Sequence, residues 1–255
     1  MYNKQAVLEA SEYFINGNTI NIFTDASIKR IRKEWAYIGC PGFIVYLGNT
    51  QLYQYTEILN FATNNESEAR AVYLALDYIN NYLSPNLFNA SRINIFCDSK
   101  LTVYAVREWY KSWFNSVDQQ GILYNSSGLP VINQRYYVDI MRQVLAINRP
   151  INFYHVKGHT TLNTKSIEVF NNTFIRENKL SSKYKTLTYT LTKFLADGNN
   201  KVDLITGLYV DYLNTENITI PYSKKDLESP FVYMDLLKSI DLKRYYELTS
   251  QFNLL

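Results

Sequence analysis

Residues 92–106 read RINIFCDSKLTVYAV, and they combine a buried strand, an acid and a helix start. The apolar run that ends at Phe96 predicts a strand, and the helical spacing of the apolar residues after it predicts a helix. Asp98 stands at the junction between the two. The same order occurs in residues 19–29, TINIFTDASIK, where an apolar run leads to Asp25. The two stretches predict strands that deliver two carboxylates to one place.

Working outward, the rest of the chain alternates short strand patterns with helical ones. Three consecutive strands with tight turns between them predict an antiparallel meander. The predicted strands cover residues 19–26, 38–47, 51–59, 92–97 and 151–156, and the predicted helices cover residues 65–82, 100–114, 133–147 and 199–213. This order predicts an α/β fold, with a mixed sheet and helices packed on both faces.

The composition indicates a globular protein with a large core. Of the 255 residues 47% are hydrophobic, and the net charge of +3 decides nothing about nucleic acid by itself. Cys40 and Cys97 lie in predicted core strands, which favours buried thiols in a reducing, cytoplasmic compartment. We expect no signal peptide and no membrane segment, because no apolar run approaches the roughly 20 residues of a span.

A helical wheel over residues 65–82 separates two glutamates. Glu66 falls on the polar face, whereas Glu68 falls on the apolar face with Val72, Ala75, Leu76 and Ile79. A carboxylate on a buried face needs a partner, and that face offers no Lys or Arg. Each predicted acid taken alone reads more simply as a helix cap or a turn residue. Asp25, Glu68 and Asp98 together predict an oxygen-only site for Mg²⁺.

Six motifs surround these acids in a fixed order. They are FTDAS with Asp25, TNNESEARAVYLAL with Glu68, IFCDSKLTV with Asp98, LPVINQRYYVDIMRQV, FYHVKGHTT with His159, and GNNKVDLIT with Asp203. In this order they resemble type 1 ribonuclease H. The resemblance implies a ribonuclease H-like fold with a five-stranded mixed sheet. It also implies a domain over residues 19–213, with a lead-in over 1–18 and a C-terminal helical extension over 214–255.

The resemblance implies endonucleolytic hydrolysis of the RNA strand of RNA–DNA hybrids. Two Mg²⁺ ions, or Mn²⁺, would be held by Asp25, Glu68, Asp98 and Asp203, and His159 would assist proton transfer or product release. The implied substrate contacts are Ser27, Thr63, Asn64, Asn65, Ser99 and Lys157. Thr63 equally suits a helix cap, and the two serines equally suit turns. His155 has only strand context and is expected to pack in the core.

The spacing departs from the family between His159 and Asp203, which lie much closer together in the relatives. The difference falls in an expected insertion over residues 160–196. It leaves Asp197 as an alternative fourth ligand, although Asp197 also suits the cap of the last helix. The insertion interleaves basic residues with tyrosines, namely Arg176, Lys179, Lys183, Tyr184, Lys185, Tyr189 and Lys193. Such a patch favours a surface for the hybrid backbone, and a solvated face is the alternative.

Three other interpretations stay open. An exonuclease or resolvase of the same superfold would share the acids, but such exonucleases usually carry a Glu where Ser27 stands. A catalytically silent hybrid-binding module is the second alternative. The extension over residues 214–255 either docks a replication partner or covers the protein's own core.

Overall fold

The computed structural model describes residues 13–30, 37–60, 62–83, 92–180, 184, 186–215 and 237–250. The strands are β1 (Thr19–Arg30), β2 (Tyr37–Leu47), β3 (Thr50–Thr56), β4 (Leu59–Asn60), β5 (Arg92–Cys97) and β6 (Ile151–His155). The helices are α2 (Asn64–Tyr82), α3 (Lys100–Tyr104), the π-helix η2 (Ala105–Trp109), α4 (Tyr110–Phe114), α5 (Gln134–Ile147), α6 (Thr164–Glu177), α7 (Tyr189–Thr215) and α9 (Leu242–Thr249). None of these described helices is long and apolar enough to cross a membrane.

The strands form one mixed sheet in the order β3-β2-β1-β5-β6. The first three strands are antiparallel neighbours, whereas β1, β5 and β6 run parallel to one another. The two-residue strand β4 adds to β2 beside this path. The predicted five-stranded mixed sheet is therefore confirmed.

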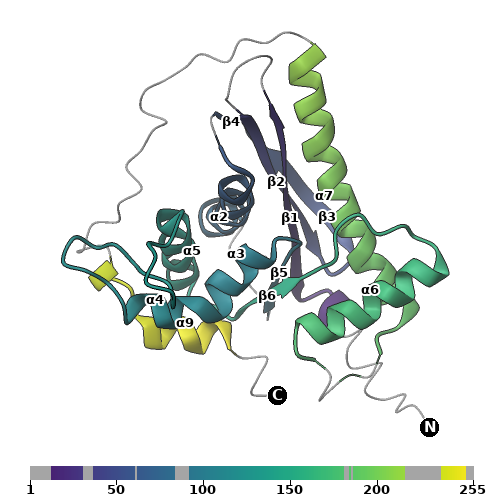
Figure 1. Ribbon diagram of the computed structural model, residues 1–255. Helices are drawn as coiled ribbons and strands as arrows, with labels where there is room; N and C mark the ends of the chain where they lie inside the picture. Colours follow the sequence, from purple (N-terminus) through teal and green to yellow (C-terminus); the bar gives the residue numbers. More distant parts are fainter. Residues whose placement is uncertain are drawn as a thin grey trace.

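Helices cover both faces of the sheet, as predicted. In Figure 1, α2 and α5 lie on one side of the strands and α7 lies on the other. Alternate residues of each strand divide between two cores, so that Ile22 and Ile95 pack toward α2, while Phe23 and Phe96 pack toward α6 and α7. We call these sides the α2 face and the α7 face.

Three asparagines cross the α7 face of the parallel strands as a buried ladder. Asn152 Nδ2 donates to Asn94 Oδ1 at 3.1 Å, and Asn94 Nδ2 donates to Asn21 Oδ1 at 3.0 Å. The three residues stand opposite one another in β6, β5 and β1. A one-residue slip of any strand would leave these buried amides unpaired, so the ladder fixes the register.

The region predicted as an insertion contains ordered helices. The sequence did not predict α6, and the last helix begins at Tyr189 instead of near residue 199. Phe170 and Phe174 of α6 belong to the buried core on the α7 face. The domain boundaries themselves stay a prediction.

The described part of the C-terminal extension covers the protein's own core. Leu237, Ile240, Tyr245 and Leu248 are buried in the cluster on the α2 face. Tyr245 also donates from its hydroxyl to the carbonyl oxygen of Val106 at 2.7 Å. This is the second of the two roles considered from the sequence, and the structure gives no support for a replication partner.

The C-terminal end of α6 is tied to α3 by ion pairs around one carboxylate. Glu177 accepts from Arg176 at 3.1 Å, pairs with Lys100 at 3.2 Å, and accepts from the Tyr104 hydroxyl at 3.1 Å. The Arg176 hydrogen bond, followed by Lys100 and Tyr104, lowers the pKa of Glu177 to about 2.

The low pKa of Glu177 predicts a pH-dependent contribution to stability. The folded pKa lies below the ordinary value of 4.5, so the stabilisation is present above that value and is lost as the pH falls toward 2. Urea unfolding should show that Glu177→Gln is less stable than the parent at pH 7, with a difference that shrinks below pH 4.5. Glu168→Gln, at an exposed site of the same helix, should stay within about 0.5 kcal/mol of the parent. A pH-independent difference for Glu177→Gln would contradict the assignment.

Close packing of α7 on β1 generates a second prediction. A Cβ at Gly198 would collide with the ring of Phe23, which is stacked on Phe96 at 4.9 Å. Gly198→Ala is therefore expected to reduce the free energy of unfolding by about 1–3 kcal/mol. Gly207→Ala is the matched control on the same helix, because its Cβ would meet only Ser27 Oγ at 3.7 Å. Denaturant titration should show that this control is neutral or gains up to about 1 kcal/mol of helix propensity.

Candidate active site

The register of the parallel strands brings two carboxylates to the same level of the sheet. Pairing between β1 and β5 ends at Thr24 opposite Cys97, so Asp25 and Asp98 follow at adjacent positions. The expectation that Asp25 ends its strand was wrong. β1 continues to Arg30 because β2 still pairs with it, with Asp25 opposite Gly42. Before Asp25, β1 has a neighbouring strand on each side, β5 and β2. From Asp25 onward it pairs with β2 alone.

Helix α2 supplies the third carboxylate. Thr63 caps the helix, and the Thr63 N–H in turn donates to Glu66 Oε2 at 2.8 Å. This capping box fixes the start of α2, so that Glu68 lies in the first turns and faces the sheet. Asp25 and Glu68 are each only 5% exposed. The predicted burial of Glu68 is confirmed, and Glu66 has a capping role that the helical wheel did not predict.

The charges of these acids oppose one another. Burial, with the nearby charges of Asp98 and Asp203, raises the pKa of Asp25 to about 8. Burial raises the pKa of Glu68 well above its usual value, and Asp25 and Asp98 raise it further. Such a set of oxygen donors is the chemistry that a hard divalent cation neutralises. The residues present therefore fit Mg²⁺.

Helix α7 brings Asp203, and not Asp197, to this cluster. Asp203 contributes to the raised pKa values of Asp25, Glu68 and Asp98. Asp197 instead pairs with Lys201 at 2.9 Å. The expectation that Asp197 caps the last helix was wrong, because α7 begins two turns earlier at Tyr189.

His159 lies beside Asp203 on the loop between β6 and α6. Its Nδ1 is 3.1 Å from Asp203 Oδ2, and its side chain is 81% exposed. A Cβ at the preceding Gly158 would collide with the Asp98 carboxylate, so only glycine lets this loop approach the acid. The next residue, Thr160, is held through its backbone, because its N–H donates to Asn200 Oδ1 at 3.2 Å and its carbonyl accepts from Asn200 Nδ2 at 2.6 Å. The His159 loop is thus docked on α7.

His155 behaves as the core residue that the sequence predicted. It is buried, and its Nε2 lies 3.1 Å from the carbonyl oxygen of Asp98. Burial lowers the pKa of His155, with a further contribution from Lys100. The neutral ring donates from Nε2 and holds the backbone beneath Asp98.

The remaining predicted contacts divide into structural and exposed residues. Ser99 caps α3 by accepting from the Thr102 N–H, and Ser27 hydrogen-bonds to Thr206 of α7 at 3.1 Å. Thr63 caps α2, as described above. Asn64, Asn65 and Lys157 are exposed.

Sequence reasoning missed two neighbours of the acids. Cys97 was interpreted only as a buried thiol, yet its Sγ lies 3.9 Å from Glu68 Oε2. Asn199 is fully buried beside Asp98, where its amide and the charge of His159 offset part of the rise that burial causes in the pKa of Asp98. The position of Cys97, directly before Asp98, could have indicated that it lies near the acids. Asn199 could not be found in this way, because the last helix was predicted to begin near residue 199 and begins at Tyr189.

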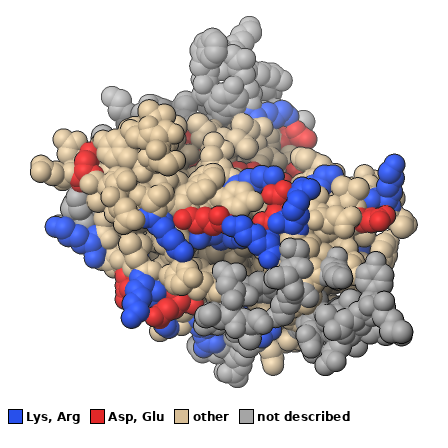
Figure 2. Space-filling model, turned by 60° about the horizontal axis from the view of Figure 1, so that its bottom comes forward, with Lys and Arg blue, Asp and Glu red and all other residues tan. Residues whose placement is uncertain are grey.

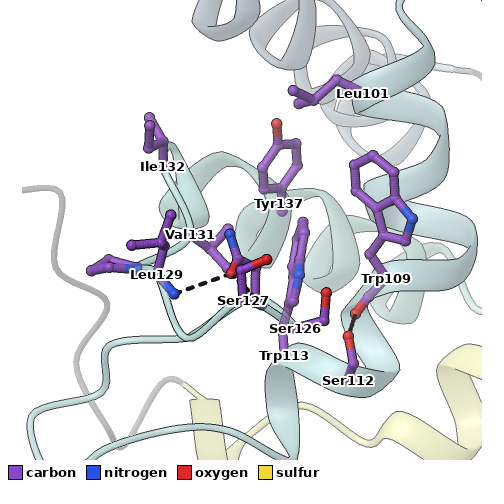
Figure 3. Close-up of a pocket in the computed structure, with 12 residues that line it drawn as sticks. Leu101, Trp109, Ser112, Trp113, Ser126, Ser127, Leu129, Val131, Ile132 and Tyr137 are labelled. Atoms are coloured by element: carbon purple, nitrogen blue, oxygen red, sulfur yellow. Dashed lines mark hydrogen bonds between the residues drawn. The ribbon is translucent and has the colours of Figure 1, made fainter.

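An uncharged groove begins at α3, directly after Asp98. Its volume is about 410 Å³, and its walls come from α3, η2, α4, α5 and the loop before α5. Figure 3 shows Trp109 and Leu129 on opposite sides, with Tyr137 between them. We call this the aromatic groove, and its lining residues are Leu101, Trp109, Ser112, Trp113, Asn125, Ser126, Ser127, Leu129, Pro130, Val131, Ile132 and Tyr137.

Comparison with models of known protein families shows to which family the chain belongs. A model of the RNase H family matches residues 17–174. The chain belongs to the RNase H family. This confirms the resemblance deduced from the motifs, and the matched range contains Asp25, Glu68, Asp98 and His159. Asp203 lies beyond the RNase H match.

Solved structures of RNases H are similar to the chain at low sequence identity. A foamy viral protease-reverse transcriptase in complex with an RNA/DNA hybrid is 18% identical over 63% of this chain and 20% of that chain, with a TM-score of 0.44. RNase H1 from Halobacterium salinarum is 15% identical over 62% of this chain and 98% of that chain, with a TM-score of 0.37. The N-terminal RNase H domain of a Mycobacterium tuberculosis protein is 17% identical over 61% of this chain and 95% of that chain, with a TM-score of 0.37. No curated protein matches the chain.

The basic patch expected in the insertion is only partly available to a ligand. Lys179 pairs with Glu108 at 2.8 Å and Arg176 pairs with Glu177, while Lys183 and Lys185 lie outside the described residues. Tyr184 is buried, so it does not contribute to the exposed surface of the patch. Figure 2 shows basic and acidic side chains alternating in a band across the forward face. The solvated alternative suits this arrangement better.

The docking of the His159 loop gives a prediction that needs no substrate. Asn200→Ala removes both hydrogen bonds to the backbone of Thr160, so the Thr160 amide should exchange with solvent at least about tenfold faster. Hydrogen exchange measured by NMR checks this. Asp197→Asn, one turn earlier on α7, is the control and should leave the Thr160 amide unchanged. Equal exchange in Asn200→Ala and the parent would contradict the docking.

Proposed function

We propose that the protein hydrolyses the RNA strand of RNA–DNA hybrids, with two Mg²⁺ ions held by Asp25, Glu68, Asp98 and Asp203. The observation that carries the proposal is the convergence of these four carboxylates from β1, α2, the residue after β5, and α7. Burial and the charges of neighbouring acids raise the pKa values of Asp25, Glu68 and Asp98, and a cluster of this kind is stable only with protons or cations bound. Membership of the RNase H family supports the substrate. Mn²⁺ is the alternative cation.

The chain's own residues provide the geometry for this reaction. When bound, Mg²⁺ supplies Lewis-acid stabilisation of charge on the phosphate and lowers the pKa of a bound water. Asp25 and Glu68 are buried and rigidly placed on the sheet and on α2, whereas Asp98 and Asp203 are part-exposed and border the solvent. The scissile phosphate is therefore expected on the side of Asp98 and Asp203.

His159 is placed to handle a proton. Its Nδ1 faces Asp203, which holds the ring in one orientation and assigns proton exchange to Nε2. The tether between Thr160 and Asn200 keeps the ring within reach of the acids. We propose that His159 accepts or donates a proton during cleavage or product release.

The surface beside the acids suits a hybrid. Asn64 and Asn65 are exposed at the first turn of α2, where their amides can both donate to and accept from a 2′-hydroxyl. The aromatic groove adjoins α3 and offers Trp109 for stacking, with no charged residue among its lining. Lys157 stands exposed before the His159 loop as a phosphate contact. An uncharged groove predicts that hybrid binding depends less on salt than a lysine-rich surface would.

The test is cleavage of labelled RNA–DNA hybrid, duplex DNA and duplex RNA in Mg²⁺. We expect cutting only of the RNA in the hybrid, and loss of at least about 100-fold in rate for Asp98→Asn and Asp203→Asn, because several kcal/mol of charge stabilisation are removed. Asp197→Asn is the matched control and should keep parental activity. Equal cutting of duplex DNA would favour another nuclease of the superfold. Hybrid binding without any cutting would favour a silent module.

A further inference from the structure

The outer strand of the antiparallel half of the sheet has an exposed edge. β3 ends the strand order, and among the described residues it pairs only with β2. Six of its seven residues are exposed. An edge strand presents a row of backbone N–H and C=O groups that another strand can use, and natural edges are usually protected by charges or proline. The sequence of β3, TQLYQYT, contains neither.

A bulge limits the part of β3 that can pair regularly with another strand. Tyr53 stands opposite Val45, and Gln51 stands opposite the next residue of β2, so Leu52 has no partner there. The regular part of the strand is therefore Tyr53–Thr56. Side chains alternate between the faces of the sheet along this part.

Aromatic contacts identify the two faces of the regular part. Tyr53 and Tyr55 lie on the α2 face, because their rings are 6.1 and 5.9 Å from the ring of Phe43, which belongs to the core on that face. Gln54 therefore points to the α7 face.

Each face of β3 continues into a groove of about 440 Å³. On the α2 face, Tyr53 stacks on Tyr78 at 4.4 Å, and Tyr78 stacks on Tyr82 at 6.1 Å. On the α7 face, the groove lies between β3 and the side chains of Leu208 and Tyr212. A strand added to β3 would thus meet apolar side chains on both of its faces.

The two grooves carry almost no charge. Among the described residues that line them, Asp77 alone is charged. Its carboxylate accepts from Asn81 Nδ2 at 2.9 Å and from Gln143 Nε2 at 3.0 Å, so it is satisfied within its own chain. A partner that recognises charge would gain little from this surface, whereas a second copy of the same neutral surface meets no like-charge repulsion.

The exposed area approaches what a stable dimer needs. Monomeric proteins rarely expose apolar patches larger than a few hundred Å². The exposed fractions of Tyr53, Tyr55, Tyr82 and Tyr212 correspond to about 400 Å², because a whole tyrosine side chain buries about 200 Å². Leu208, which is 58% exposed, and the strand itself bring the surface toward the roughly 800 Å² that each partner contributes to a stable interface.

We propose that two copies of this chain associate through β3, as antiparallel strands related by a two-fold axis at Gln54. An axis perpendicular to the sheet joins two identical edges in this way and keeps the α2 faces on one side. Tyr53 then stands opposite the partner's Tyr55, and aromatic cross-strand pairs stabilise antiparallel strands. An axis at Tyr55 would instead place Tyr53 opposite the partner's Glu57, and an axis at Tyr53 would include the bulge.

The first measurement is sedimentation velocity of the full chain, in a concentration series up to about 100 μM, which covers associations weaker than a micromolar Kd. We expect a reversible equilibrium between monomer and dimer. Gln54→Lys places two like charges opposite each other at the axis, so it should raise the Kd of the dimer at least about tenfold. Gln54→Glu should do the same, and an equimolar mixture of the two variants should recover a dimer. Val169→Lys, at an exposed apolar site on α6, is the control and should keep the parental Kd.

Cross-linking tests the register. Residues directly opposite each other in an antiparallel pair have Cα atoms about 4.5–5.5 Å apart, which suits a disulfide. Gln54→Cys should therefore form an intermolecular disulfide under mild oxidation, whereas Val169→Cys should not, and the native Cys40 and Cys97 are buried.

Circular dichroism establishes that the variants are folded. A parent that stays monomeric throughout the series, including one that binds a strand of another protein, would overturn the proposal. So would a dimer that Gln54→Lys leaves unchanged, or one that Gln54→Cys fails to cross-link. The proposal does not rest on the proposed function, because each of these measurements is made without nucleic acid.

Discussion

The parallel register between β1 and β5 is the constraint on which the site depends. With Thr24 opposite Cys97, the chain places Asp25 and Asp98 side by side, and a slip of one residue would turn one carboxylate to the other face. The ladder of Asn21, Asn94 and Asn152 enforces this register from within the core. Apolar strands alone tolerate register errors better, so the buried amides contribute specificity where the chemistry needs it.

The fold holds the acids of the site close together although their negative charges repel one another. Three of its acids have raised pKa values because burial and mutual repulsion oppose their charged forms. The surrounding packing has to offset that cost. Stacked rings pack on the α7 face, such as Phe23 on Phe96 at 4.9 Å and Phe96 on Tyr154 at 5.3 Å, and Phe23 and Phe96 stand two residues before Asp25 and Asp98. Rigid strands therefore hold together a cluster of acids that would otherwise spread apart.

Local patterns in the sequence predicted the sheet and three of the four acids. Glu68 was found because a helix repeats every 3.6 residues, and Asp98 because an apolar run stops before it. Patterns failed where distant contacts decide the structure. The length of β1 depends on its pairing with β2. In α6, polar residues are interleaved with the phenylalanines that its buried face contributes to the core. No short-range signal shows that Tyr189 begins α7, so the surroundings of Asn199 and Asn200 could not be predicted.

The placement of α7 explains how His159 and Asp203 meet although they are far apart in the sequence. A helix presents residues three apart on one side, so Asn200 and Asp203 face the same loop. One holds the backbone of Thr160 and the other meets the His159 ring. Because α7 is also locked to β1 at Gly198, its position does not depend on the length of chain that precedes it. Helix α6 can therefore be accommodated between the histidine and the last acid without moving either of them.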